Sequence, residues 1–169
     1  MSLSPHVITA LETQATAEIA AAQAYLAMSC WCEVHHHDGF ARFFRQQAVE
    51  ERGHAERLLK HLTDRDVLPH IGAIPAPSTA FKGLLSVAQA AYDQERANTR
   101  GIHAAYEAAL AEKDYPAQVL LHWFIGEQVE EEAWSDQLLA KVRDAGCAGA
   151  LLSLDRHVEK ILGGQSGAD

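Results

Sequence analysis

Apolar side chains recur every three or four residues along four long stretches of the chain, which is the spacing of helices that turn one face toward a core. These stretches predict helices over about residues 5–34, 39–66, 79–112 and 116–145, followed by a short amphipathic helix over about 150–162. Regularly spaced short segments of alternating polarity, which would indicate strands, are not evident. The pattern therefore predicts an all-α protein.

The predicted helix ends coincide with residues that commonly begin or end helices. Ser4 is a good N-cap, and Pro5 suits the first turn that follows it. Asp38, in the polar stretch HHHDG between the first two helices, can cap the second helix. Pro116 suits the first turn of the fourth helix, and Gly146 is placed to end it. Because only a short link joins the first two helices, they are expected to be antiparallel.

The segment between the second and third helices has a different composition. Its sequence VLPHIGAIPAPS, residues 67–78, contains three prolines and a glycine, which favour an extended chain over a helix. Twelve extended residues can reach about 40 Å, and the second helix is also about 40 Å long. This connection can therefore cross the length of a bundle and return the chain parallel to the second helix, giving a four-helix bundle with one long crossover.

Each long helix carries a carboxylate within its apolar stripe. These residues are Glu18 in the first helix, Glu51 with His54 in the second, Glu95 in the third and Glu131 in the fourth. At a rise of about 1.5 Å per residue, the four carboxylates lie about 18 to 24 Å from the end where the first helix turns into the second. The topology therefore predicts that they meet near one level of the bundle.

Four buried carboxylates at one level would repel one another, and each would lose solvation energy. No lysine or arginine occupies these stripe positions, so a bound divalent cation is the simplest source of compensating charge. Oxygen-rich coordination with one imidazole suits iron or manganese better than zinc, without excluding zinc. Glu51 and His54 have the E-x-x-H spacing of carboxylate-bridged di-metal bundles, which makes two ions plausible and Glu51 the candidate bridge.

Length and charge exclude several other classes of protein. The 169 residues fit one domain, over residues 1–169. The net charge is −9 with only 14 lysines and arginines, which argues against binding to the phosphate backbone of nucleic acid. Cations are the more suitable partners.

Membrane insertion and disulfide chemistry are not expected either. The longest uncharged helical run, residues 19–32, is too short to span a bilayer, and the start of the chain has no basic leader region. We therefore expect a cytoplasmic protein. Cys30, Cys32 and Cys147 are odd in number and form no zinc pattern, so we interpret them as reduced core or interface residues.

The chain resembles the ferritin-like proteins, and within them the non-haem bacterial ferritins. The resemblance covers nearly the whole chain, and its motifs are Glu18 with Tyr25, the EERGH run at 50–54, Glu95, the DYP break at 114–116 and the segment WFIGEQVEEEAW at 123–134. It implies a ferritin-like four-helix bundle with a long crossover between the second and third helices and a short fifth C-terminal helix.

The resemblance also implies three iron sites. Glu18, Glu51 and His54 match the first site of the family. Glu51 as bridge, Glu95 and Glu131 match the second, with Gln128 beside it. A third site is typical of the bacterial non-haem branch of the family. The residues that match it here are Glu50, Glu127 and Glu130.

Two departures distinguish the chain from related families. Bacterioferritins and rubrerythrin-like proteins place a second E-x-x-H on the fourth helix, whereas this chain has Gln128 at the corresponding spacing from Glu131. The second site should therefore hold metal less firmly, which favours iron as a substrate that passes through. Bacterioferritin binds haem through a methionine on its second helix, and the only methionines here are Met1 and Met28. We expect no haem.

The resemblance implies an iron-storage ferritin with ferroxidase activity. Ferrous iron would be oxidised by dioxygen or hydrogen peroxide at the di-iron centre and deposited as ferric mineral inside a homo-oligomeric cage of 24 subunits. Tyr25 would donate an electron or a hydrogen bond there, or be a core tyrosine. Trp123 is interpreted as core packing, with redox service as the alternative. His35, His36 and His37 are interpreted as a solvated loop, with a metal site as the alternative.

Two alternatives remain open from the sequence. A ferritin-like di-iron oxidase or peroxidase would keep its metals as a fixed cofactor and store nothing. A metal-free helical bundle would act as an interaction module, and its melting temperature would not respond to ferrous iron.

Overall fold

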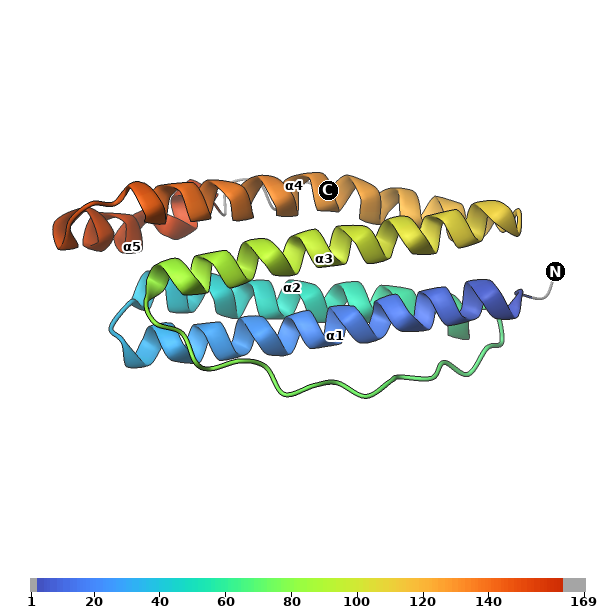
Figure 1. Ribbon diagram of the computed structural model, residues 1–169. Helices are drawn as coiled ribbons and strands as arrows, with labels where there is room; N and C mark the ends of the chain where they lie inside the picture. Colours follow the sequence, from blue (N-terminus) through green and yellow to red (C-terminus); the bar gives the residue numbers. More distant parts are fainter. Residues whose placement is uncertain (1–2, 163–169) are drawn as a thin grey trace.

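The computed structural model describes residues 3–162, which form five helices and no strand. The helices are α1 (Pro5–Val34), α2 (Asp38–Thr63), α3 (Leu84–Ala111), α4 (Tyr115–Asp144) and α5 (Ala148–Leu162) (Figure 1). The predicted all-α class is confirmed, and no helix in the described part is long and apolar enough to cross a membrane. The ends of the predicted domain, residues 1–2 and 163–169, lie outside the described residues.

The four long helices pack side by side, and the direction of α3 is the one that the crossover predicts. Figure 1 shows α2 and α3 running in the same direction, because the segment between them returns along the length of the bundle. This segment is attached to α1 at two points. The backbone N–H of His70 donates to Glu12 Oε1 (2.8 Å), and that of Gly72 donates to Thr16 Oγ1 (3.0 Å). The extended chain is therefore held against the bundle by its own backbone donors.

The crossover segment is longer than predicted, because helices α2 and α3 are both shorter at this point. Helix α2 ends at Thr63 instead of residue 66, and Asp66 has a left-handed backbone (φ 59°). Helix α3 begins at Leu84 instead of residue 79. The hydroxyl of Ser86 accepts hydrogen bonds from the backbone N–H groups of Lys82 (2.9 Å) and Gly83 (3.2 Å), which holds these residues in a turn ahead of the helix.

The start of α2 is capped from a distant part of the chain. The prediction that Asp38 caps this helix is wrong, because Asp38 is its first helical residue and the N-cap, His37, makes no side-chain capping bond. Instead, Asp155 of α5 accepts a hydrogen bond on Oδ1 from the backbone N–H of Phe40 (3.0 Å). Asp155 is buried, so its carboxylate satisfies one of the free donors of the helix end. Helix α5 is thereby attached to the bundle that contains α2.

The other predicted starts and ends hold to within two residues. Ser4 accepts from the N–H of Val7 (3.3 Å) and Asp114 accepts from that of Ala117 (3.1 Å), so both caps precede a first-turn proline. Helix α5 begins at Ala148 instead of residue 150.

The apolar core consists of two clusters that lie toward opposite ends of the bundle. One contains Tyr25, Phe44 and Trp134 together with the buried residues of α5, and the other contains Leu11, Ile102 and Phe124. The fifth helix buries Leu154, Val158 and Leu162 in the first cluster, so much of its apolar face is covered within its own chain. Along every long helix, the carboxylates of the apolar stripes fall between the residues of the two clusters.

Candidate metal centre

The structure brings together the stripe residues that the four long helices were predicted to contribute. Glu18 and Glu95 are fully buried, and Glu51, His54 and Glu131 are between 1% and 7% exposed. These residues form two groups of three in which each residue offers one ligand atom and the three atoms all lie within 4.8 Å of one another. The first group is Glu18, Glu51 and His54, and the second is Glu51, Glu95 and Glu131. Glu51 is common to both groups, so its two oxygens are placed to serve two ions.

The first group is organised around His54. The Nδ1 atom of His54 lies 3.4 Å from Glu51 Oε2 and 3.9 Å from Glu18 Oε2. Glu51 and His54 lie one turn apart on α2, which is why the E-x-x-H spacing puts both on one face. The imidazole ring packs edge-on against Trp123 and Phe124, with ring centroids 5.5 and 5.8 Å away, so its plane is fixed by apolar contacts.

The second group is organised by hydrogen bonds from residues that are not carboxylates. Tyr25 donates its hydroxyl to Glu95, and Trp134 donates its indole N–H to Glu131. Gln128 lies with its Nε2 atom 3.4 Å from Glu95 Oε2 and 3.1 Å from the hydroxyl of Thr99. The amide of Gln128 thus donates to the second group instead of adding another negative charge to it.

Burial and mutual repulsion raise the pKa values of three carboxyl groups in the centre, those of Glu51, Glu95 and Glu131. The pKa of Glu95 is raised to about 7, above all because burial removes water from its charged form. The pKa values of Glu51 and Glu131 are also raised, first by burial and then by the negative charge of Glu95. Burial likewise raises the pKa of Tyr25, and the charges of Glu95 and Glu51 raise it further. In the described residues no lysine or arginine is buried, so these charges have no buried protein counterion.

Two atoms of the centre have no hydrogen-bond partner in the described part of the chain. They are Oε2 of Glu51 and Nδ1 of His54, both buried and both in the first group. An unpaired buried acceptor costs free energy, which a coordinated cation would recover. Hard oxygen donors with one imidazole nitrogen are a ligand set that suits iron. The residues of this centre are therefore suited to bind iron ions.

The residues matched to a third site are less closely grouped. Glu127 has a ligand atom within 4.8 Å of atoms of His54 and Glu131. The charges of Glu50 and Glu127 both contribute to the raised pKa of Glu131. Glu130 is exposed, and Glu50 accepts from the amides of Gln46 (3.1 Å) and Gln47 (2.8 Å). The third site remains a prediction.

Several other residues that the sequence singled out lie away from the carboxylates. His35 stacks on Trp31 with ring centroids 3.9 Å apart, and both His35 and His36 are exposed. Cys32 is buried in the core, whereas Cys30 and Cys147 are exposed, so the core interpretation holds for Cys32 and an interface role for the other two stays a prediction. Trp123 packs edge-on against His54, and the guanidinium carbon of Arg57 lies 3.8 Å from the centroid of its ring. It is therefore closer to the centre than a simple core residue.

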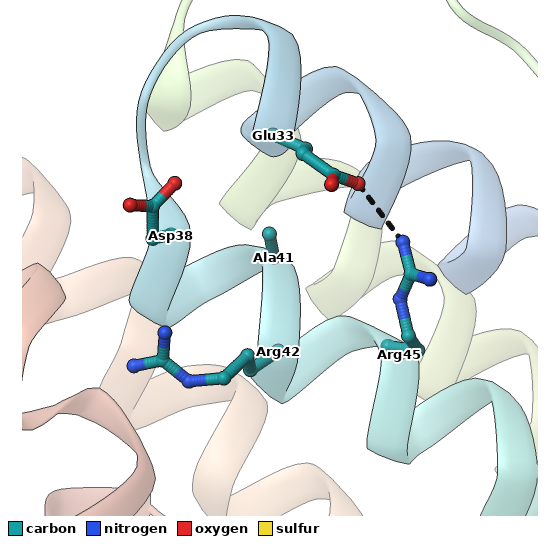
Figure 2. Close-up of a pocket in the computed structure, with 5 residues that line it drawn as sticks. All are labelled: Glu33, Asp38, Ala41, Arg42 and Arg45. Carbon is teal, nitrogen blue, oxygen red and sulfur yellow. Dashed lines mark hydrogen bonds and ion pairs between the residues drawn. The ribbon is translucent and has the colours of Figure 1, made fainter.

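A surface depression near the turn between α1 and α2 is a separate feature. Figure 2 shows that Glu33, Asp38, Ala41, Arg42 and Arg45 line it, with Arg45 Nη2 3.0 Å from Glu33 Oε2. Its two carboxylates are balanced by two guanidinium groups, so the lining offers no excess of negative charge to a cation.

Comparison with known proteins identifies the family. Residues 8–145 match the model of the ferritin family, described as a ferritin-like domain. This chain belongs to the ferritin family. It is 39% identical to a bacterial non-heme ferritin of Staphylococcus aureus, over 78% of this chain and 79% of that protein. It is 33% identical to one of Escherichia coli O6:H1, over 94% and 97% of the two chains.

Solved structures of ferritins have the same fold. An open pore ferritin from the hyperthermophilic archaeon Archaeoglobus fulgidus is 32% identical, with a TM-score of 0.89, covering 93% of this chain and 98% of that chain. The ferritin-like four-helix bundle with a short C-terminal helix is therefore confirmed as the fold of this chain.

Sequence reasoning missed two buried polar residues that contact Glu18, one of the candidate ligands. Gln14 donates to Glu18 Oε1 (2.7 Å), and Asn98 donates to Glu18 Oε2 (3.4 Å). A signal was present for both. Gln14 lies four residues before Glu18 on the same helix face, and Asn98 is a polar residue within the apolar stripe of α3.

Proposed function

We propose that this protein is an iron-storage ferritin that oxidises ferrous iron at a di-iron ferroxidase centre. The observation that carries the proposal is the pair of buried three-ligand groups that share Glu51 inside a ferritin bundle. Two ferrous ions would bind as substrates, one at Glu18, Glu51 and His54 and the other at Glu51, Glu95 and Glu131. The ferric product would then leave for a mineral core.

The protein's contribution to this chemistry is charge and position. Ionised carboxylates stabilise the higher charge of ferric iron more than that of ferrous iron, which favours electron transfer to dioxygen or hydrogen peroxide. In the metal-free protein the carboxyl groups of Glu51, Glu95 and Glu131 have raised pKa values. Ion binding would therefore displace protons from these groups. The hydroxyl of Tyr25 holds Glu95 in place through its hydrogen bond.

The route of iron beyond the paired site follows from the remaining acidic residues. Glu127 would receive an ion from the paired site, and its grouping with His54 and Glu131 supports this role. Glu50 and Glu130 would complete the third site, as the family resemblance implies. Gln128 would act near the second site as a neutral donor that keeps its affinity low.

Cage assembly and location complete the proposal. A homo-oligomer of 24 subunits in the cytoplasm would enclose the mineral, with each chain acting as one ferritin-like domain over residues 1–169. The net charge of −9 suits a shell that attracts cations. Size-exclusion chromatography tests the assembly, and elution near the size of a dimer without ferrous oxidation would contradict storage.

The Glu51→Gln variant tests the paired site directly. We expect the initial rate of aerobic ferrous oxidation to fall by at least about tenfold, because one neutral amide replaces the carboxylate that both groups share. Glu56→Gln is the matched control, since Glu56 is exposed on the same helix. Equal rates for the wild type and Glu51→Gln would rule out this site as the ferroxidase centre.

A further inference from the structure

The carboxylate of Glu18 is held by side chains that have no part in the family's ligand set. Its Oε1 atom accepts from Gln14 Nε2 at 2.7 Å, and its Oε2 atom accepts from Asn98 Nδ2 at 3.4 Å. Gln14 and Asn98 are each 2% exposed, so water does not compete for these bonds. Both oxygens of one metal-ligating carboxylate are therefore fixed by neutral donors from two helices.

The orientation of the Asn98 amide is itself set by a neighbour. Gln94 donates from Nε2 to the Oδ1 atom of Asn98 at 3.2 Å. With its oxygen engaged in this way, the Asn98 side chain turns its NH2 group toward Glu18. Oε2 of Glu18, which accepts from that group, is the oxygen that lies 3.9 Å from His54 Nδ1. The amide therefore steadies the oxygen that faces the ion-binding position.

The place of Gln14 depends on a glycine in the opposite helix. A Cβ atom at Gly101 would lie 2.0 Å from Gln14 Oε1 and 3.1 Å from its Cδ. Gly101 lies within α3, where glycine lowers helix stability relative to alanine by about 1 kcal/mol. The chain accepts that cost at the one place where the amide of Gln14 lies against α3.

We propose that Gln14 and Asn98 are positioning residues that hold Glu18 ready for the first ferrous ion, and that Gly101 provides the space that Gln14 requires. The proposal rests on the proposed function, since it concerns the same centre. A carboxylate that already points at His54 loses less conformational freedom when it binds an ion. The affinity of the group formed by Glu18, Glu51 and His54 therefore depends on the two amides, whereas the group of Glu51, Glu95 and Glu131 has its own donors.

The experiment titrates the full-length assembled protein with Co²⁺, which is not oxidised when it binds. The absorption spectrum of bound Co²⁺ depends on its ligands and therefore measures its binding. The variants Gln14→Met and Asn98→Leu keep the side-chain volume but lose the donor. We expect each to weaken binding of the first Co²⁺ by about tenfold or more, as is typical when partners of metal ligands are removed. In iron oxidation, the KM for ferrous iron should rise while the rate at saturating iron stays within about twofold.

The Gly101→Ala variant provides an independent test, because it changes neither Glu18 nor its two partners. The added methyl group meets only the flexible end of the Gln14 side chain, so Gln14 should move and the fold should remain. We expect weaker binding of the first Co²⁺ with an unchanged or higher melting temperature. Gly126→Ala is the matched control, since it lies in α4 and a Cβ there would meet nothing within 4 Å.

The outcomes separate this proposal from the proposed function. Wild-type affinity for the first Co²⁺ in Gln14→Met, Asn98→Leu and Gly101→Ala would overturn the positioning role, even if the wild type oxidises iron. Weaker binding in these three variants, with no ferrous oxidation by the wild type, would support positioning and reject the ferroxidase function. A loss of affinity in Gly126→Ala as well would also overturn the proposal, because it would trace the effect to helix stability.

Discussion

Glu51 differs from the other carboxylates of the candidate centre in how its oxygens are engaged. Glu18, Glu95 and Glu131 each accept hydrogen bonds from an amide, a phenol or an indole, whereas Glu51 Oε2 has no hydrogen-bond partner in the described part. A carboxylate without competing donors keeps its lone pairs available for cations. Glu51, the candidate bridge between two ions, therefore has one oxygen without a hydrogen-bond partner.

The raised pKa of Glu95 predicts how stability of the metal-free protein depends on pH. The folded-state value of about 7 exceeds the ordinary value of 4.5, so the folded protein holds more protons between these values. The stability that protonated Glu95 contributes is fully present below about pH 4.5 and is lost as the pH rises through about 7. We therefore expect the free energy of unfolding in the presence of a chelator to decrease from about pH 5 to about pH 7.5.

The Glu95→Gln variant checks this assignment by chemical denaturation over the same pH range. Glutamine is neutral and can still accept the hydrogen bond from Tyr25, so the decrease with pH should become shallower. Parallel profiles for the variant and the wild type would show that Glu95 is not responsible.

The grouping of the candidate ligands was predictable from the sequence because each breaks an apolar stripe at a similar height. Glu18, Glu51, Glu95 and Glu131 are charges in a buried face, which is a visible anomaly. The direction of each hydrogen bond was not predictable, because it depends on rotamers and on contacts between helices. Asn98 illustrates this limit, since its role depends on the neighbouring helix α1.

At the scale of helices, α5 closes the bundle by capping α2. A Cβ atom at Gly39 would lie 1.7 Å from the backbone oxygen of Asp155 and 2.7 Å from its carbonyl carbon. Only glycine allows the backbones of α2 and α5 to come this close, and this contact places the Asp155 carboxylate at the start of α2. The glycine and the cap act together.

The Gly39→Ala variant should therefore displace α5. Because the methyl group would meet backbone atoms, a side-chain rotation cannot relieve the overlap, and we expect a lower melting temperature with faster amide exchange in α5. Gly53→Ala on the same helix is the control, since a Cβ there meets nothing within 4 Å. That variant should gain about 0.5 to 1 kcal/mol of stability. Unchanged exchange in α5 of Gly39→Ala would contradict the close packing.

Helix identity was easier to predict than helix ends. The crossover followed from three prolines, but the extra residues before α3 depend on the hydroxyl of Ser86 and its bonds to Lys82 and Gly83. The cap of α2 comes from a residue 115 positions away from Phe40, which no local pattern contains. Long-range caps of this kind are outside the reach of local rules.

At the scale of the whole molecule, a layer of acidic residues separates the two apolar clusters of the core. This acidic layer consists of Glu18, Glu51, Glu95 and Glu131. The clusters supply most of the burial that stabilises the bundle, while the layer between them holds carboxylates with raised pKa values. Ion binding should therefore stabilise the whole fold through mass action.

Anaerobic ferrous iron should raise the melting temperature of the assembled protein at neutral pH. A ligand at about 100 times its dissociation constant stabilises the folded state by about 2.7 kcal/mol per site. Differential scanning calorimetry with and without iron measures the shift, and Glu51→Gln should reduce it. The absence of any shift in the wild type would favour a metal-free interaction module.

The division of the core also separates how the molecule keeps its shape from what it does. Replacing the central acidic residues with neutral ones removes a source of repulsion and leaves both apolar clusters intact. Such changes should therefore abolish the activity while the fold is kept. Chains that lose the central carboxylates could therefore keep this bundle fold, so that reactivity could be gained or lost without a change of fold.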